Sequence, residues 1–397
     1  MTVSAAEQVA SICQRLVQVP SVTGQEGPAV EECRKVMQEL GFDRVWVDDW
    51  GNLIGQMGSG RGGVLFDAHI DTVGPGKAED WTRDPFGGTR EGDLIYGRGS
   101  ADMKGALAAM MVAAARLKEE GFGFESPVTV SATVLEETTE GVALARVLED
   151  IDPRLVVVGE ATQLAPNLGG RGRAEIRLEA VGQSAHSSSP EEGLNALDVM
   201  VPALERIAQM ELPTDDRVGR ALAVVTDLWS EPRPSRSVIP HYAAAVMDRR
   251  LIPGETKEST LEGLRAHLEP AVRGRILLEG FEEAAPGDLL LTVVDEEVRT
   301  YTGRRLSGEK VAPAWISEPA DPPISRVLSA LREAGFDREP GYYQFCTNAS
   351  MSAGVMGYPT LGLGPGTEGR AHTADEWISL EELDGAERAY RAIMSSF

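Results

Sequence analysis

The sequence contains few cysteines and few positive charges for its length. Among its 397 residues are three cysteines, Cys13, Cys33 and Cys346, and no two of them form a CxxC pair. Three scattered thiols do not make a disulfide framework, which excludes the class of small disulfide-stapled folds. Lysine and arginine number 38 against 62 aspartates and glutamates, a formal net charge of −24. This acidic balance argues against nucleic acid or an anionic membrane surface as a partner.

Long hydrophobic runs are also missing. The most apolar stretch, residues 105–117, is shorter than the roughly 20 residues that a membrane-spanning helix needs. The first residues, MTVSAAE, show no basic segment followed by an apolar one, which is the pattern of a secretory signal. We therefore expect a cytoplasmic protein without a membrane partner.

The length and the residue pattern indicate two domains. One hydrophobic core rarely grows beyond about 250–300 residues, so a chain of 397 favours two. Residues 4–159 alternate helix-like segments with Val-rich, strand-like segments, which is typical of an α/β domain with a buried sheet. Proline- and glycine-bearing breaks at 163–173 and 311–323 flank a β-α-β-β-α-β-like stretch, and α/β character returns after the second break.

We therefore predict a discontinuous α/β catalytic domain, residues 1–172 and 313–397, with a two-layer α+β domain, residues 173–312, inserted in it. The expected helices are 4–17, 27–40, 103–119, 193–210, 256–268 and 324–335. The expected strands are 44–47, 53–56, 64–69, 128–135, 155–159, 174–181, 242–250, 275–280 and 360–364.

Histidine is scarce, and two of the five histidines lie in motifs rich in carboxylates. The motif AHIDTV, residues 68–73, directly follows an apolar run, and VLEETTEG, residues 134–141, follows another. GRGSADMKG (97–105) opens an Ala- and Met-rich helix, VVVGEAT covers 156–162, and AHTADE covers 371–376. Four of these motifs lie where a strand-like run ends, and ligand sites in α/β sheets gather at the carboxyl ends of strands.

Each motif taken alone has a less specific interpretation. A His-x-Asp pair is more often a surface pair and a Glu pair more often a solvated loop, so one motif has about one chance in ten of marking a metal site. Their conjunction changes this, because imidazole and carboxylate are zinc ligands, and two zinc ions about 3.5–4 Å apart can hold a water and an electrophile together. The sequence thus predicts a two-metal hydrolase. The candidate residues are His69, Asp71, Asp102, Glu136, Glu137, Glu160 and His372.

These motifs resemble the di-zinc metallopeptidase and deacylase family of acetylornithine deacetylase, succinyl-diaminopimelate desuccinylase, aminoacylase and glutamate carboxypeptidase. The resemblance covers essentially the whole chain. It implies a zinc-exopeptidase-like α/β/α catalytic domain, an inserted ferredoxin-like dimerisation or lid domain, and a homodimer. By the same resemblance His69 and Glu160 bind one zinc, Glu137 and His372 bind the other, and Asp102 bridges them.

The resemblance also assigns roles to groups around the metals. Glu136 is the expected general base, and Asp71 is expected to fix the tautomer and the direction of His69. The peptide bond after the bridging aspartate, Asp102–Met103, is expected to be cis. The implied cofactors are two Zn²⁺ ions, for which Co²⁺ or Mn²⁺ could substitute.

The inserted segment carries its own part of the resemblance. In VGQSAHSS, His186 matches the family histidine that reaches across a dimer interface into the partner's site. SVIP (237–240) followed by DRR (248–250) is similar to the family pattern Asn-x-Ile-Pro…Asp-x-Arg. Arg250 would then bind a substrate carboxylate through its planar, bidentate donors. Arg249 is expected on the other face of the same strand, as a surface charge.

The chain departs from the family pattern around the expected pocket. Ser237 stands where the family has Asn, and Leu135 stands where it has Asp before the Glu pair. Residues 346–348 read CTN in place of Gly-Thr-Asp. Ser237, Thr347 and Asn348 are expected to contact the substrate. Every expected metal ligand is kept, but the substrate of a well-known member cannot be carried over.

The predicted reaction is hydrolysis of the amide bond of an N-acyl amino acid with a free carboxylate, of the deacetylase or desuccinylase type. A hydroxide shared by two zinc ions would attack the carbonyl, Glu136 would move its proton to the leaving amine, and His186 of the partner subunit would stabilise the oxyanion. Two alternatives stay open: a dipeptidase or carboxypeptidase of the same family and, more remotely, a non-catalytic metal-binding protein. The complete ligand set and the intact Glu136 argue against the last.

Overall fold

The computed structural model describes residues 4–397, which form two compact units. Unit 1 comprises the chain up to Gly170, Glu297–Leu306 and Trp315–Phe397, and unit 2 comprises Arg171–Glu296 and Ser307–Ala314. Within the described residues, no helix has both the length and the apolar character that crossing a membrane would require.

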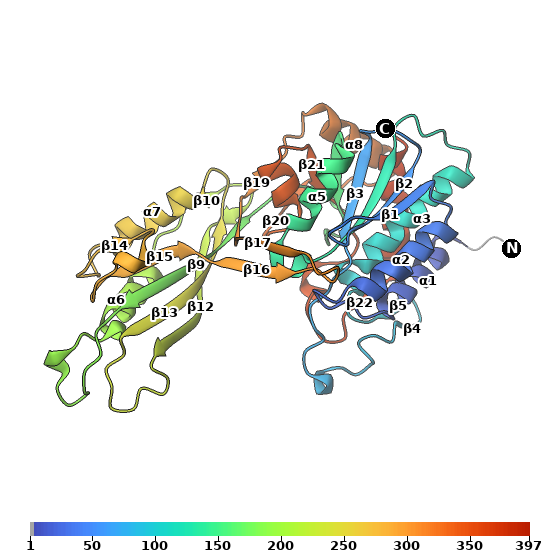
Figure 1. Ribbon diagram of the computed structural model, residues 1–397. Helices are drawn as coiled ribbons and strands as arrows, with labels where there is room; N and C mark the ends of the chain where they lie inside the picture. Colours follow the sequence, from blue (N-terminus) through green and yellow to red (C-terminus); the bar gives the residue numbers. More distant parts are fainter. Residues whose placement is uncertain (1–3) are drawn as a thin grey trace. The chain divides into compact units, whose positions relative to one another are not determined.

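Unit 1 is built on a nine-stranded sheet (Figure 1). The strand order is β1-β2-β6-β3-β7-β21-β8-β19, with β20 paired to β8. The four central strands β6, β3, β7 and β21 are parallel, so their carboxyl ends meet at one edge. The strands are β1 Arg44–Val47, β2 Leu53–Met57, β3 Val64–His69, β6 Val128–Thr133, β7 Leu155–Val158, β8 Asn167–Gly170, β19 Trp315–Ile316, β20 Gly341–Tyr343 and β21 Thr360–Gly362.

Helices cover both faces of this sheet, because the central strands β3 and β7 each contribute to two hydrophobic cores. In β3, Phe66 and Ala68 pack in one core while Leu65 packs in the other. Successive side chains of a strand point to opposite faces, so a continuous apolar run serves a strand buried on both sides. The first core holds α1 Ala5–Val17, α2 Gly27–Glu39, α3 Gly105–Glu119, α8 Pro322–Glu333 and α9 Leu380–Met394, and the second holds α5 Val142–Ile151. Unit 1 also contains the short helix α4 (Glu136–Thr139) and a small sheet of β4 Thr89–Glu91, β5 Leu94–Tyr96 and β22 Trp377–Ser379.

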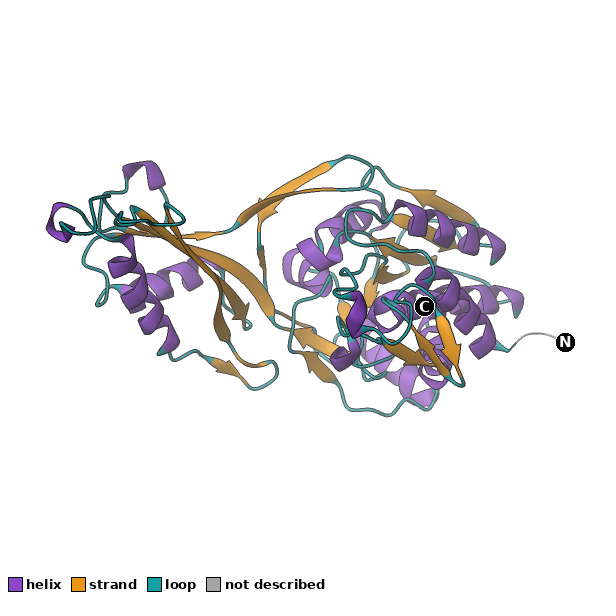
Figure 2. Ribbon diagram, turned by 90° about the horizontal axis from the view of Figure 1, so that it is seen from below, coloured by secondary structure: helices purple, strands orange, loops and turns teal. Residues whose placement is uncertain are grey.

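Unit 2 is a two-layer α+β structure, with both helices on one face of a sheet (Figure 2). The chain runs β9-α6-β12-β13-α7-β15, and the strands lie in the order β12-β13-β9-β15-β14, with β18 paired to β9. Along β9 burial alternates at every residue, and Ile176 and Leu178 point into the core beneath the helices. This confirms the predicted βαββαβ, ferredoxin-like pattern. The elements are β9 Gly172–Val181, α6 Ala196–Ala208, β10 Thr214–Asp215, β11 Gly219–Arg220, β12 Leu222–Glu231, β13 Tyr242–Leu251, α7 Lys257–Leu268, β14 Ile276–Leu277, β15 Leu289–Val293 and β18 Val311–Ala312.

The compact units differ from the predicted domains by two residues at each boundary and in one longer segment. The predicted insertion, 173–312, is continuous, whereas residues 297–306 inside it belong to unit 1. They form the tip of a hairpin of β16 (Asp295–Arg299) and β17 (Arg305–Glu309). The division into a catalytic and an inserted domain stays a prediction.

Several local expectations need correction. The strand expected at 275–280 is only the two-residue β14, and β12, β15, α5 and α9 lie outside the expected set. Arg249 is no surface charge: it is 2% exposed and forms an ion pair with Glu255. It does lie on the opposite face of β13 from the partly exposed Arg250.

Candidate metal centre

Three of the candidate residues reach one place because their strands are parallel neighbours. β3 ends at His69, and β7 ends two residues before Glu160. β6 ends three residues before Glu136, and it pairs with β3 on the other side. The carboxyl edge of the sheet therefore collects an imidazole and two carboxylates, all buried.

Asp102 connects this group to His372. It lies in an irregular turn, Ser100–Lys104, that leads into α3, and its backbone angles there are non-helical. The peptide bond Asp102–Met103 is cis, as expected. Asp102 Oδ1 lies 3.0 Å from His69 Nε2, and Asp102 Oδ2 lies 3.4 Å from His372 Nε2.

Two imidazole–carboxylate pairs thus face the two oxygens of one aspartate. On the Oδ1 side, His69 Nε2 lies 3.5 Å from Glu160 Oε1. On the Oδ2 side, His372 Nε2 lies 2.9 Å from Glu137 Oε2. The two oxygens of Asp102 therefore lie next to two different imidazole–carboxylate pairs; that these residues ligate two metal ions stays a prediction.

The electrostatics of the carboxylates show that the cluster needs positive charge. Burial, followed by the neighbouring charges of Asp102 and Glu137, raises the pKa of Glu160 to about 8. Burial also raises the pKa of Glu136 well above its usual range. Without cations these groups hold protons, because closely spaced carboxylates in a buried site cannot all ionise.

The histidines respond in the opposite direction. Hydrogen bonds to Asp102 and Glu137 raise the pKa of His372 to about 10. Burial alone would lower the pKa of His69, but the nearby carboxylates, Glu136 first, outweigh burial and raise it well above its usual value. A convergent set of imidazoles and carboxylates that attracts protons this strongly fits divalent cations such as zinc, which take the place of those protons when bound.

Asp71 contacts both His69 and the main chain of the two glutamates, and the atom that lies closest to His69 is its main-chain oxygen, not its carboxylate. The main-chain oxygen of Asp71 lies 2.9 Å from His69 Nδ1, closer than its carboxylate at 3.6 Å. A proton on Nδ1 leaves Nε2 free to act as a ligand. The carboxylate instead accepts hydrogen bonds from the main-chain N–H groups of Glu136 (3.1 Å) and Glu137 (3.2 Å) and from Thr23 Oγ1 (2.8 Å).

Glu376 supports the turn that carries Asp102, and no role was predicted for it from the sequence. Its fully buried carboxylate accepts hydrogen bonds from Arg98 Nη1 at 2.7 Å and from three main-chain N–H groups, those of Gly99, Ala101 and Asp102, at 2.8–3.0 Å. It thereby ties the segment of His372 to the turn that carries Asp102. Glu376 ends the motif AHTADE, but no local pattern distinguishes it from a solvated acid.

Thr347 and Asn348 are both buried in unit 1. The side-chain amide of Asn348 donates to Asp67 Oδ2 at 2.8 Å and to Thr133 Oγ1 at 3.1 Å. Thr347 Oγ1 accepts from the main-chain N–H of Ala349. Their expected contacts with the substrate stay predictions.

The remaining candidates belong to unit 2. His186 Nδ1 accepts from Ser188 Oγ, at 2.8 Å, and from the Ser188 main chain. Ser237 has a positive φ of 53° in the loop before β13. Arg250, on β13, donates from Nε to Asp248 at 2.8 Å. The roles of His186, Ser237 and Arg250 stay predictions.

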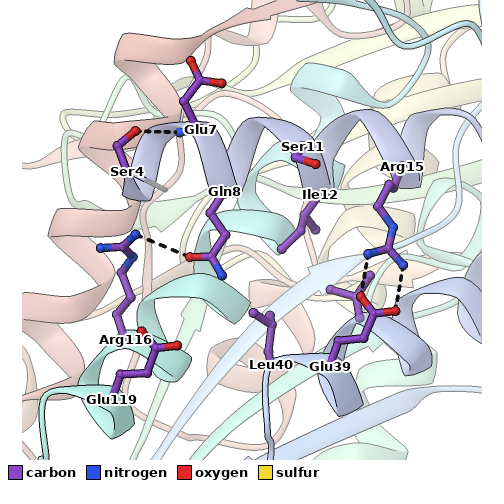
Figure 3. A pocket seen from close by; sticks show the side chains of 11 residues that line it. Ser4, Glu7, Gln8, Ser11, Ile12, Arg15, Glu39, Leu40, Arg116 and Glu119 are labelled. Carbon is purple, nitrogen blue, oxygen red and sulfur yellow. Dashed lines mark hydrogen bonds and ion pairs between the residues drawn. The ribbon is translucent and has the colours of Figure 1, made fainter. Parts of the chain in front are cut away.

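A separate polar pocket of about 630 Å³ lies among α1, α2 and α3 (Figure 3). Arg15 reaches across it to Glu39, and Arg116 donates to Gln8. None of the residues that line this pocket belongs to the metal centre. Of its charged groups, Arg15 pairs with Glu39 across the pocket, whereas Glu7 pairs with Arg90, which does not line it.

Comparison with known proteins places the chain in a family. A family model described as peptidase family M20/M25/M40 matches residues 65–396. The protein YgeY of Escherichia coli (strain K12), described as uncharacterized, is 32% identical over 388 residues, which cover 96% of this chain and 92% of YgeY. Acetylornithine deacetylase of Aliivibrio salmonicida (strain LFI1238) is 30% identical over 393 residues, covering 94% and 93%. Among solved structures, aminopeptidase PepT from Bacillus cereus ATCC 10987 is 21% identical, with a TM-score of 0.72 over 98% of both chains.

These matches extend over the metal-centre motifs and both units. They confirm the resemblance stated from the motifs, and the likeness to PepT confirms the fold. The chain belongs to peptidase family M20/M25/M40 and is a metal-dependent hydrolase.

Proposed function

We propose that this protein hydrolyses the amide bond of an N-acyl amino acid that carries a free carboxylate, with two zinc ions as cofactors. The observation that carries the proposal is Asp102, whose two oxygens face two separate imidazole–carboxylate pairs. His69 and Glu160 would hold one ion, His372 and Glu137 the other. Bound there, the ions would supply Lewis acidity and lower the pKa of a water molecule.

Glu136 would move the proton. Its carboxylate is buried and its Oε2 lies 4.0 Å from His69 Nε2, beside the expected ligands. An amide nitrogen cannot leave as an anion, so the reaction needs a group that takes a proton from water and returns it to nitrogen. The burial of Glu136 beside the expected ligands places it to take that proton and return it.

Arg250 would select the carboxylate of the substrate. Its Nε donates a hydrogen bond to Asp248, while its two terminal nitrogens, Nη1 and Nη2, have no partner among residues 4–397. A guanidinium fixed in this way can offer a planar fork to a carboxylate. The 30% identity to an acetylornithine deacetylase supports an acyl amino acid over other amides.

The assembly and location belong to the same proposal. We expect a homodimer in which His186 of the partner subunit completes each site and stabilises the oxyanion. We also expect the protein in the cytoplasm, and its three buried cysteines, none of which forms a disulfide, suit a reducing compartment. Zinc is the proposed metal, with cobalt or manganese as functional substitutes.

The test is amine release by the zinc-loaded protein from a panel of N-acetyl, N-succinyl and N-carbamoyl amino acids and simple dipeptides. Hydrolysis of an acyl amino acid that stops on chelation and returns with zinc would support the proposal. Hydrolysis of dipeptides alone would replace it with the peptidase alternative. N-acyl amino acid amides, which lack the carboxylate, serve as the matched control for Arg250 and should react poorly.

A further inference from the structure

The tip of the β16–β17 hairpin packs against two segments, one around Gly27 and one around Gly51. Side chains of these two segments form hydrogen bonds to the main chain of the residues just before Glu136. The two strands pair with each other, and the turn between them covers residues 300–304 (Figure 1). Residues 297–306 belong to unit 1, although the chain on either side of them belongs to unit 2. The proposed reaction assigns no role to this hairpin.

Tyr301 is the central contact of this tip. Its ring occupies the space where side chains would stand at Gly27 and Gly51, so a Cβ at either position would collide with the ring. Its hydroxyl donates to the main-chain oxygen of Gly51 at 3.1 Å. Two further contacts fix the tip: Thr302 Oγ1 donates to the Asp49 main chain at 3.0 Å, and Arg304 forms an ion pair with Asp49.

The residues next to these two glycines hold the loop that carries the glutamates. Asn52, which follows Gly51, accepts a hydrogen bond from the Val134 N–H through Oδ1 at 3.2 Å. Glu26, which precedes Gly27, accepts one from the Leu135 N–H through Oε1 at 3.2 Å. Both side chains are fully buried.

The backbone at Leu135 needs such support. Leu135 has a φ of 61°, in the left-handed region that a leucine rarely adopts. This conformation turns the chain from β6 into Glu136 and Glu137, whose N–H groups then reach Asp71. If Leu135 relaxed toward ordinary backbone angles, both glutamates would change direction.

We propose that Tyr301 is a positioning residue for the reaction, which acts through Glu26 and Asn52 to hold Leu135 and thereby aim Glu136 and Glu137. The hairpin tip is then a support for the catalytic loop, supplied by a segment that is flanked on both sides by unit 2. The inference rests on the proposed function for the roles of Glu136 and Glu137, but the support itself is measurable without a substrate.

The test is hydrogen–deuterium exchange in the peptide covering residues 132–137 of the full-length protein. Tyr301→Ala removes the ring, and Gly27→Ala displaces it without removing it. Each should speed exchange in this peptide about fivefold, the effect of weakening one hydrogen bond. Tyr301→Phe keeps the ring and should stay near wild type. Arg305→Ala is the matched control, because Arg305 lies on the same hairpin, is largely exposed and, within residues 4–397, forms its ion pair with the exposed Glu297.

A double variant tests the route. If Tyr301 acts through Asn52, then Tyr301→Ala with Asn52→Ala should change exchange by less than the product of the two single effects. Zinc titration gives a second readout, and Tyr301→Ala should weaken binding of one zinc by about tenfold, as losses of supporting contacts do.

Two results would overturn the proposal. One is unchanged exchange at 132–137 in both Tyr301→Ala and Gly27→Ala. The other is faster exchange spread evenly over unit 1, which would make Tyr301 an ordinary packing residue. Neither readout needs an amide substrate, so a negative substrate panel would remove the proposed function and leave this inference to be decided separately.

Discussion

At the scale of single residues, we propose that Asp102 serves metal binding and that Glu136 serves proton transfer. Asp102 faces both histidines, so both halves of the centre depend on it. Glu136 is also buried, and its Oε2 lies 4.0 Å from His69 Nε2, but it is not one of the expected metal ligands. The candidate ligands could be selected from the sequence because each lies in a short motif, and most of these motifs follow an apolar, strand-like run; their binding of metal stays a prediction. Glu26, Asn52 and Glu376 could not, since their partners are main-chain groups distant in sequence and local patterns do not encode such pairs.

Glu136→Gln tests this division. Glutamine keeps the size of the side chain but cannot accept a proton, so amide hydrolysis should fall by about 10²–10⁴-fold. Zinc content should stay at the wild-type level, since Glu136 is not an expected ligand. Turnover by Glu136→Gln at the wild-type rate would show that another group moves the proton. Glu149→Gln, at an exposed position on α5 where the glutamate pairs with Arg146, is the control and should stay active.

Glu26 predicts a pH dependence of stability. Burial, followed by the charge of Asp71, raises its pKa from 4.5 to about 7. Between these values the folded protein keeps a proton that the unfolded chain has released, so the free energy of unfolding falls as pH rises from about 4.5 to about 7. Glu26→Gln lacks this titration and should be more stable than wild type by about 3 kcal/mol at pH 8, and equal near pH 4.5.

The measurement is urea unfolding of the metal-free protein at pH 4.5, 6 and 8. Glu31→Gln serves as control and should track wild type, because Glu31 is an exposed glutamate on α2, the helix that follows Glu26, and pairs with Arg34. Parallel pH profiles for wild type and Glu26→Gln would contradict the raised pKa.

At the scale of elements, the site depends on the parallel strands β6, β3 and β7. These were predictable because strands buried on both faces read as continuous apolar runs. β12 was missed because it is a sheet edge that exposes Val224 and Leu228, and its register shifts between Val225 and Asp227, which breaks the two-residue period. The hairpin tip at 297–306 was missed because its packing against Gly27 and Gly51 is a long-range contact.

Glu376 connects the segment of His372 to the turn that carries Asp102, and removing its carboxylate tests this connection. Glu376→Ala leaves the buried Arg98 unpaired and frees the turn that carries Asp102. We expect a loss of stability of about 3–5 kcal/mol and weaker zinc binding. Glu382→Ala, which removes a helix cap and a partly exposed ion pair with Arg370, should cost only about 1 kcal/mol and leave zinc binding intact. Equal zinc affinity in the two variants would contradict the role of Glu376.

At the scale of the whole molecule, we propose that two residues of unit 2, Arg250 and the partner subunit's His186, serve the reaction at the metal centre of unit 1. Mixing inactive His186→Ala with inactive Arg250→Ala tests whether His186 acts across a dimer interface. If His186 acts across the interface and Arg250 within its own chain, a mixed dimer places both defects in one site and leaves the other intact. Half of a random mixture is mixed dimer, so activity should return to about a quarter of wild type. No recovery after subunit exchange would mean that His186 acts within its own chain or has no role.

The most direct test of the account is the number of zinc ions per folded chain, measured by elemental mass spectrometry after zinc loading and removal of free metal. The arrangement of His69, Glu160, Asp102, Glu137 and His372 predicts two. A folded protein that retains one zinc or none would contradict the two-metal centre, and with it the mechanism built on Asp102.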